Sequence, residues 1–244
     1  MAQAGAVYYA VIDIINEVRK LLQYNTVTRL DADKYCDVHL RLLNQIVDEI
    51  SNYGDWPELY ATCTVPVKAS VYDYTMASAV NPVTDPVQRV YEVAFENQRQ
   101  PLYFISIQEF NMLRRGSQGS TGNPRQYTIR GTDQFGNPKI SVHMMPGRVD
   151  VNNIQRFGQG FNITYYMKVG TYDKTTADNL VPFPANMVIA GLYATALVEE
   201  SGGAMTKEAQ DAYATFKNLM ERSQQRHTTD TDVDTRLVPM YRGR

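Results

Sequence analysis

Apolar side chains near the start of the chain recur every three or four positions, which is the spacing of one face of a helix. The first set predicts a helix over residues 7–22 and consists of Val7, Val11, Ile14, Val18 and Leu21. After a connection at 25–30, a second set predicts a helix with Asp31 as its N-cap and Gly54 just past its end. This second stripe consists of Tyr35, Val38, Leu42, Ile46, Ile50 and Tyr53.

The spacing of apolar residues changes to a β-like pattern after Pro57. "GFNITYYMKVG" at 160–170 alternates most clearly and predicts a strand. "RQYTIRGTDQFGNPKISVHMMPG" at 125–147 predicts a hairpin, because Gly136-Asn137-Pro138 is a turn signal between two β-like runs. "SIQEFNMLRRG" at 106–116 predicts a short helix inserted among the strands.

Helical spacing returns near Leu180. The run "MVIAGLYATALV" has only twelve residues, so it predicts a buried helix and not a membrane span. Gly202-Gly203 ends this helix, and Thr206 caps the last one. The predicted buried face of the first of these helices consists of Phe183, Met187, Ala190, Ala194 and Leu197.

These patterns together predict an α+β fold. Both chain ends, 1–57 and 173–227, form a domain resembling a four-helix bundle, and an antiparallel β domain at 58–172 is inserted between them. Residues 228–244 lack periodicity and predict an extended C-terminal tail.

The single tryptophan lies where the helical pattern stops, in "SNYGDWPELYAT". An indole at such a place can fill the seam between two layers while its N–H donates to a carbonyl. Trp56 and Pro57 are therefore predicted to pack at the domain junction and to hold the two domains at a fixed angle.

Composition narrows the functional classes. The chain has 24 Lys and Arg against 26 Asp and Glu, a net charge of −2, whereas duplex-binding domains usually show a basic excess. Its 17 tyrosines suit either β strands or half-wet protein interfaces, and both interpretations stay open. Neither a signal peptide nor a disulfide framework is indicated, which favours synthesis in the cytoplasm.

Candidate chemistry is sparse. The Gly-rich loop at 116–123 lacks the pattern of a phosphate loop, and Ser117 and Ser120 lack a nucleophile motif. Cys36 and His39 are three positions apart on a helix, but a structural zinc needs four ligands. The acidic run "TDTDVD" lacks the glycine and glutamate of a calcium loop. We therefore predict no catalytic, cofactor or metal site.

The end of the chain, "RLVPMYRGR", departs from an ordinary polar tail because four large apolar residues lie within five positions. Pro239 fixes one backbone angle and so lowers the cost of ordering the segment. We expect a docking segment that folds on binding, formed by Arg236, Leu237, Val238, Pro239, Met240, Tyr241 and Arg242.

The order of these features resembles the head-to-tail connector, or adaptor, proteins of tailed bacteriophages, close to the tail-tubular-protein-A type. The resemblance spans nearly the whole chain and is carried by a few phrases in this order: "NYGDWPEL", "QPLYFISIQEF", "GNPKISVHMMPG", "FNITYYMKV", "NLVPFPANMVIAGLYATAL" and "RLVPMYRGR". The long β insert departs from the shortest, all-helical adaptors.

The resemblance implies a structural virion protein, made in the host cytoplasm, that forms a dodecameric ring between the portal and the tail. Its expected partners are further copies of itself, the portal protein and a tail nozzle or tail tube protein. DNA passes through such a ring without specific binding, and no membrane is involved. Two alternatives stay open, namely another virion subunit (nozzle or head-closure protein) and a hydrolase that uses carboxylates such as Glu109 and Asp133.

Overall fold

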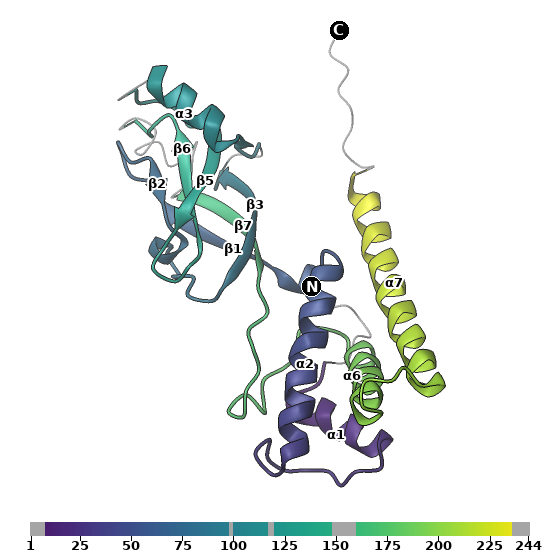
Figure 1. Cartoon of the computed structure of the whole chain (residues 1–244). Coiled ribbons are helices and arrows are strands. Elements are labelled where there is room, and N and C mark those ends of the chain that lie inside the picture. The colour runs from purple at the N-terminus through teal and green to yellow at the C-terminus, as the bar shows by residue number, and fades with distance from the viewer. Residues whose placement is uncertain (1–7, 98–99, 117–119, 148–159, 236–244) are drawn as a thin grey trace. The chain divides into compact units, whose positions relative to one another are not determined.

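A computed structural model describes residues 8–97, 100–116, 120–147 and 160–235, with side chains described as far as residue 225. The chain divides into two compact units (Figure 1). The helical unit comprises Met1–Leu59 and Thr171–Arg244, and the β unit comprises Tyr60–Gly170. With five α-helices and two sheets in the described residues, the fold is α+β, as predicted.

Both ends of the chain contribute helices to the helical unit. Near the N-terminus lie α1 (Val11–Leu21) and α2 (Lys34–Tyr53), and the short 3-10 helix η1 (Pro57–Leu59) follows. After the β unit come α6 (Ala185–Glu200) and α7 (Lys207–Thr235). α6 packs against α1, α2 and α7, so it joins the helices from the two ends of the chain.

α6 lies at the centre of this packing and is apolar on most of its circumference. The predicted buried helix is confirmed, but its buried residues differ from the predicted face. Val188, Leu192 and Ala196 are buried in addition, whereas Ala190 and Leu197 are only partly buried. Gly191 permits the close approach of its neighbours. A Cβ added there would lie 2.9 Å from Ile46 Cγ2 on α2 and 2.9 Å from Phe216 Cε2 on α7.

The helix ends follow the expected chemistry with one correction. The N-cap of α2 is Asp33 and not Asp31, because the Asp33 side chain accepts a hydrogen bond from the backbone N–H of Cys36 at 2.9 Å. Thr206 caps α7 as predicted, through a 3.2 Å bond from the N–H of Ala209. Gly202 and Gly203 end the α6 segment with positive φ angles of 66° and 91°.

The β unit consists of two sheets. The three-stranded sheet has the order β1 (Tyr60–Pro66), β7 (Gly160–Met167), β3 (Val87–Phe95), and all its pairs are antiparallel. The four-stranded sheet has the order β2 (Asp73–Tyr74), β6 (Pro138–His143), β5 (Gln126–Thr132), β4 (Tyr103–Phe104). Its β4–β5 pair is parallel, so the expectation of a purely antiparallel domain is wrong at this edge.

One apolar cluster joins side chains of both sheets. β7 contributes Phe161, Ile163 and Tyr165, and the four-stranded sheet contributes Ile140 and Val142 among others. On the four-stranded sheet, α3 (Ile107–Gly116) packs against β5 and β6 and buries Phe110. The short 3-10 helix η2 (Met76–Ser78) packs against β1 of the three-stranded sheet. The predicted strand at 160–170 and the short helix at 106–116 are both confirmed.

The predicted hairpin is formed by β5 and β6. Its turn is built by Asp133, whose Oδ1 accepts from the N–H groups of Phe135 and Asn137, and by Gly136 with φ of 82°. The buried amide of Asn137 extends the contact. Its Oδ1 accepts from the N–H of Val87 at 2.9 Å, and its Nδ2 donates to the carbonyl of Asp85 at 3.1 Å. The turn thereby fixes the start of β3.

The last helix is longer than the sequence indicated. The predicted tail was to begin at residue 228, but the backbone of α7 stays helical to Thr235, which includes the run "TDTDVD". Charged residues on this helix outnumber apolar ones after Met220, so the apolar periodicity that marks a packed helix is absent there. Among the described residues, no helix combines the length and the apolar character needed to cross a bilayer.

Candidate functional site

Trp56 belongs to the core of the helical unit. Its side chain is fully buried, its indole N–H donates to the carbonyl of Ile50 at 2.6 Å, and its ring meets Phe183 edge-on with centroids 5.5 Å apart. Pro57 opens η1 directly after it. Trp56 therefore ties the end of α2 to the segment that enters α6. The predicted role of Trp56 and Pro57 in holding two domains at a fixed angle stays a prediction.

The predicted docking tail lies outside the described residues. This applies to Arg236, Leu237, Val238, Pro239, Met240, Tyr241 and Arg242. Among the described residues, α7 continues to Thr235, directly before this segment in the sequence.

Cys36 and His39 lie on one face of α2, inside the helical unit. Arg19 of α1 is the charged group beside them, with its Nη1 donating to Cys36 Sγ at 3.6 Å. Arg19 also holds Asp33 in a two-point ion pair, Nη2–Oδ2 2.7 Å and Nη1–Oδ1 3.2 Å, and its Nε donates to the carbonyl of Asn25 at 2.6 Å. This face of α2 thus contacts α1 through the buried guanidinium of Arg19.

The electrostatics of this cluster favour a structural role. Burial raises the pKa of the Cys36 thiol, so the reactive thiolate is disfavoured. Burial and then the Arg19 charge lower the pKa of His39, which keeps its imidazole neutral at pH 7. The Arg19 guanidinium, with the N–H of Cys36, holds the pKa of Asp33 far below its usual range. Among the described residues, no group of three or more His, Cys, Asp or Glu is placed to hold a metal ion.

The two carboxylates of the hydrolase alternative have separate roles in the β unit. Glu109 lies exposed in the first turn of α3. Asp133 lies in the β5–β6 turn, where its carboxylate accepts backbone hydrogen bonds. Ser117 lies outside the described residues, and Ser120 contributes its carbonyl to a bond from the N–H of Met145. No hydrogen bond or ion pair joins Glu109 to Asp133 in the part of the chain that the structure describes, and the hydrolase alternative stays a hypothesis.

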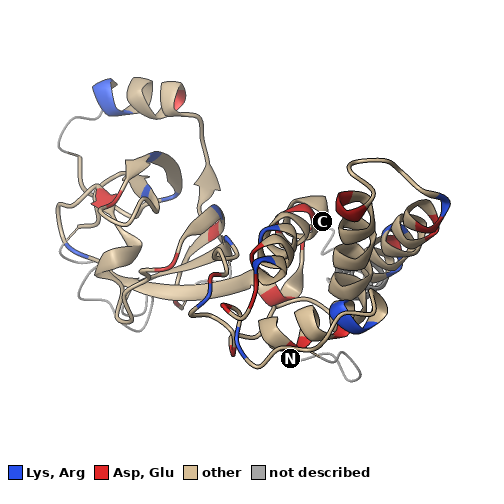
Figure 2. Ribbon diagram, turned by 60° about the horizontal axis from the view of Figure 1, so that its bottom comes forward, with Lys and Arg blue, Asp and Glu red and all other residues tan. Residues whose placement is uncertain are grey.

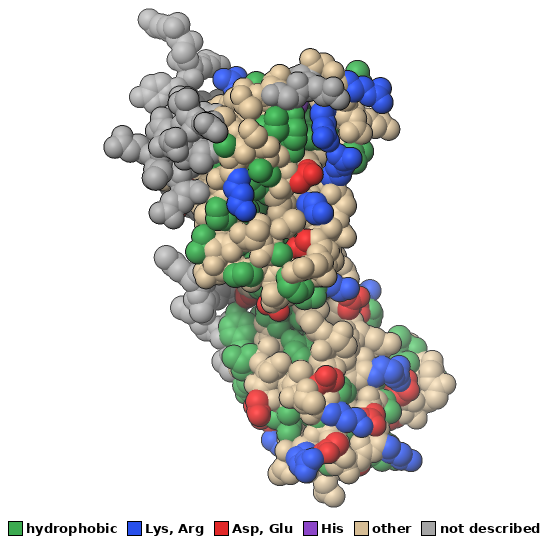
Figure 3. Space-filling model, turned by 90° about the vertical axis from the view of Figure 1, so that its left-hand side faces the viewer, with side chains coloured by type: hydrophobic (Ala, Val, Ile, Leu, Met, Phe, Trp, Pro, Cys, Tyr) green, Lys and Arg blue, Asp and Glu red, His purple; other side chains and the backbone are tan. Residues whose placement is uncertain are grey.

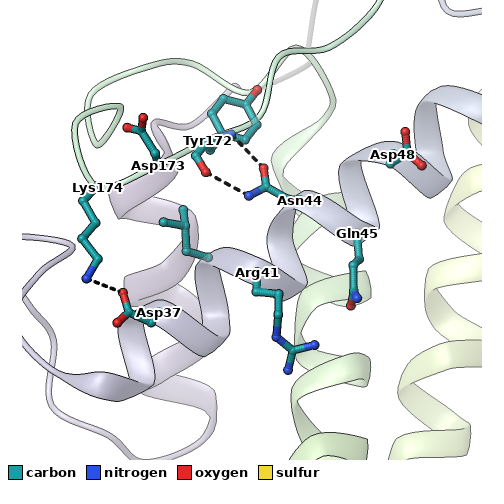
Figure 4. A pocket seen from close by; sticks show the side chains of 9 residues that line it. Asp37, Arg41, Asn44, Gln45, Asp48, Tyr172, Asp173 and Lys174 are labelled. Atoms are coloured by element: carbon teal, nitrogen blue, oxygen red, sulfur yellow. Dashed lines mark hydrogen bonds and ion pairs between the residues drawn. The ribbon is translucent and has the colours of Figure 1, made fainter.

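A groove lined by apolar and polar side chains runs along α2 in the helical unit and is shown in Figure 4. It is open, has a volume of about 600 Å³, and runs between α2 and the segment that leaves the β unit. We call it the α2 groove. It is lined by Asp37, Leu40, Arg41, Asn44, Gln45, Asp48, Tyr172, Asp173 and Lys174.

Asn44 fixes one wall of the α2 groove. Its Nδ2 donates to the carbonyl of Tyr172 at 2.9 Å, and its Oδ1 accepts from the N–H of Tyr172 at 2.8 Å. Lys174 adds an ion pair with Asp37 at 2.8 Å (Figure 4). Asp173 turns the segment by accepting from the N–H and hydroxyl of Thr175, and these bonds lower the pKa of Asp173. The hydrogen bonds from Asn44 to the backbone of Tyr172 thus hold this wall of the groove in place.

The α2 groove suits binding and not proton transfer. Leu40 and Tyr172 are each 7% exposed and form an apolar floor, and burial raises the pKa of the Tyr172 phenol to about 12. The rim carries the carboxylates of Asp37, Asp48 and Asp173, and Arg41 is held by Glu199 at 2.7 Å. An apolar floor with a charged rim is the arrangement of a small protein-docking surface.

The sequence did not indicate this groove. Asp37, Arg41, Gln45 and Asp48 recur at helical spacing opposite the apolar stripe, which is the ordinary pattern of a solvated face. The signal that it forms a wall lies in Tyr172–Lys174, more than a hundred residues away, and only the fold brings the two together.

A comparison with protein-family models and with curated protein sequences found no match.

Proposed function

We propose that this chain is the subunit of a homo-oligomeric ring, dodecameric by its resemblance, that joins the portal of a phage head to the tail. In this proposal it is a structural virion protein and not an enzyme. It lines the channel through which DNA leaves, and its portal contact is made by residues 236–242. The inserted β unit meets the nozzle or tail tube protein.

One observation carries the proposal, namely the order of elements in a single chain. Two helices from the N-terminal part, α1 and α2, and two from the C-terminal part, α6 and α7, pack into one unit, with a β unit inserted between them. α7, the last described element before residues 236–242, belongs to this helical unit. The segment after α7 is thereby carried by the helical unit, which supports its role as the portal anchor.

The charge of the chain supports the channel role. A subunit that conducts DNA without retaining it has to avoid a large phosphate-binding surface, because each phosphate contact adds affinity. The net charge of −2 shows that the chain as a whole has no excess of basic side chains for such contacts. The 17 tyrosines supply side chains that suit protein interfaces.

The proposal is tested by mixing the purified full-length chain with the portal protein encoded in the same genome and sedimenting the mixture. We expect the chain to co-sediment with portal rings and to leave the supernatant at a fixed ratio. A parallel mixture with the nozzle protein alone separates the adaptor from other virion subunits. Binding to the nozzle without binding to the portal would reject the adaptor assignment.

A further inference from the structure

The β unit exposes a group of large apolar side chains at one edge of its four-stranded sheet. We call Tyr103, Phe104, Ile107 and Met112 the apolar edge patch. Their exposed fractions are 68%, 61%, 45% and 72%. Tyr103 and Phe104 lie on β4, and Ile107 and Met112 lie on α3 directly after it. Single exposed apolar residues are ordinary, whereas four large ones within ten positions are of the kind found at protein interaction sites.

The local structure explains why this patch faces outward. β4 is the edge strand and pairs only with β5, through bonds from Tyr103 N to Arg125 O and from Ile105 N to Tyr127 O, both 2.9 Å. Tyr103 and Phe104 are adjacent in a strand, so their side chains point to opposite faces of the sheet at its edge. α3 follows at once and buries only Phe110 fully, which leaves Met112 in solvent.

Arginine side chains accompany the patch. Between residues 101 and 132 the sequence has four arginines, Arg114, Arg115, Arg125 and Arg130, and the only acidic residue is Glu109. Arg114 lies over the ring of Tyr72 at 4.8 Å, whereas Arg115 is exposed at the end of α3. Figure 3 shows a face of the molecule on which basic side chains stand among apolar ones over the β unit.

The two units carry opposite charge. Residues 60–170 contain 11 Lys and Arg against 7 Asp and Glu, a net charge of +4, and the rest of the chain contains 13 against 19, a net charge of −6. In the ribbon of Figure 2, acidic positions recur along the helices of the helical unit, with basic positions among them. The total charge of −2 is therefore the sum of a basic β unit and an acidic helical unit. The β unit of one copy is attracted to the helical unit of another copy.

The α2 groove offers the matching surface on the helical unit. Its floor is apolar, and Asp37, Asp48, Asp173 and the adjacent Glu199 give four carboxylates against the two cations Arg41 and Lys174. Two of these carboxylates, Asp37 and Glu199, are held in ion pairs within the groove. Asp48 is exposed and has no ion-pair partner among the described residues, so it can accept an incoming arginine.

We propose that the apolar edge patch of one copy docks on the α2 groove of a second copy, with Met112 on the apolar floor and Arg115 opposite Asp48. Met is unbranched and adapts to an open groove. Such a contact joins two different faces, so each copy keeps one face for the next and the assembly closes into a ring or continues as a filament. The inference deepens the proposed function by naming the surfaces between ring neighbours, and it rests on that function only for the closure of the ring.

A nucleic acid is a less suitable occupant of the same patch. Stacking on single-stranded DNA needs flat side chains on one surface, whereas Tyr103 and Phe104 point to opposite faces of β4 and Ile107 and Met112 offer no plane. The carboxylates that complement the arginines are moreover present in this same chain.

Sedimentation velocity of the purified full-length chain tests the proposal across a concentration series. We expect wild type to associate, and Met112→Asp and Asp48→Lys each to weaken association about tenfold or more. Both positions are exposed, so both variants are expected to fold. Met205→Asp and Asp211→Lys are matched controls, at exposed positions outside both surfaces, and are expected to associate as wild type.

Mixing the two variants identifies the contact. Met112→Asp retains an intact groove and Asp48→Lys retains an intact patch, so their mixture is expected to form dimers that do not grow. The exchange Arg115→Glu with Asp48→Lys in one chain is expected to restore association. Association that Met112→Asp abolishes and Asp48→Lys leaves unchanged would show that the patch meets some other surface, and would overturn the proposal.

Three further results would also overturn it. The first is a wild-type chain that stays monomeric at its highest soluble concentration. The second is self-association that neither variant changes. The third is binding of a single-stranded oligonucleotide, followed by fluorescence anisotropy, that Met112→Asp and Arg115→Glu weaken while self-association is unchanged. If the variants behave as expected but the wild-type chain does not co-sediment with the portal, the docking inference stands and the proposed function falls.

Discussion

Arg19 of α1 and Asp33 at the N-cap of α2 form a two-point ion pair across the connection between the first two helices. The Arg19 side chain is 4% exposed and the Asp33 side chain is 35% exposed, and the shortest contact between them, Nη2–Oδ2, is 2.7 Å. Because Arg19 also donates to the carbonyl of Asn25, one buried cation fixes both the connecting segment and the start of α2. Removal of its partner would leave a buried charge uncompensated.

The first prediction concerns Asp33→Asn. Asparagine is an equally good N-cap, so the substitution removes the ion pair and keeps the cap. We expect the free energy of unfolding at pH 7 to fall by about 3 kcal/mol, because Arg19 loses its counter-charge in a buried place. Urea denaturation measures this, and Asp31→Asn, whose partner Arg29 is exposed, serves as a control with little effect.

The same pair predicts a dependence of stability on pH. The pKa of Asp33 is lower in the folded chain than in the unfolded one, so its stabilising contribution is complete above the unfolded pKa of about 3.9. That contribution is lost as the pH falls through about 3.9 toward the folded pKa. Between pH 5 and pH 3, the loss of stability is expected to be steeper for wild type than for Asp33→Asn. Equal slopes for the two proteins would contradict the assignment.

Trp56→Ala is expected to lower the free energy of unfolding by about 3–5 kcal/mol, because a large cavity opens beside Phe183. Trp56→Phe keeps most of the ring but removes the donor to the carbonyl of Ile50, so its cost is expected to be smaller. Thermal melts followed by circular dichroism compare both variants with Tyr53→Ala, an exposed control. A Trp56→Ala melt that coincides with wild type would show that the indole does not pack in the core.

Gly191→Ala tests the close packing around α6. Alanine gains about 1 kcal/mol in helix propensity over glycine, but the new Cβ would lie 2.9 Å from Ile46 and Phe216, both buried. Overpacking of this kind typically costs about 1–3 kcal/mol, so we expect net destabilisation. Gly170→Ala, where an added Cβ meets no atom within 4 Å, is the matched control for chemical denaturation. A more stable Gly191→Ala protein would mean that the three helices are packed less tightly.

The elements that could be predicted from the sequence are those with a strong local signal. The turn at Gly136-Asn137-Pro138, the alternation in 160–167 and the apolar run in α6 each specify their structure within a few residues. The predicted apolar stripe of α2 is buried at its centre, as expected, but is exposed at its two ends. Tyr35 and Tyr53 are 42% and 47% exposed, because the amphipathic tyrosine satisfies a helical pattern and still tolerates water.

The rest depended on contacts that are distant in the sequence. The parallel pairing of β4 with β5 involves two residues, too few for any periodicity. The N-cap Asp33 competes with Asp31 two positions earlier, and the partner Arg19 on α1 distinguishes them in the fold. The α2 groove requires Tyr172–Lys174 to return to α2, and the apolar edge patch requires β4 to lie at the edge of a sheet.

The tail prediction is tested by deletion of residues 236–244, which leaves all of α7 in the chain. We expect portal co-sedimentation to be lost while the circular dichroism spectrum is unchanged. A full-length variant with alanine at the four apolar positions Leu237, Val238, Met240 and Tyr241 separates the loss of anchoring side chains from the loss of chain length. Full portal binding by a well-folded truncation would move the anchor to the helical unit.

The central claim, that this chain forms a ring on a portal, is tested most directly by electron microscopy of the purified chain mixed with portal rings. The account predicts end-on class averages with rotational symmetry and a layer of added density on one end of each portal ring. Mass measurement of the same complex gives the number of copies in that layer. Portal rings that stay bare while the chain remains folded and monomeric would contradict the account.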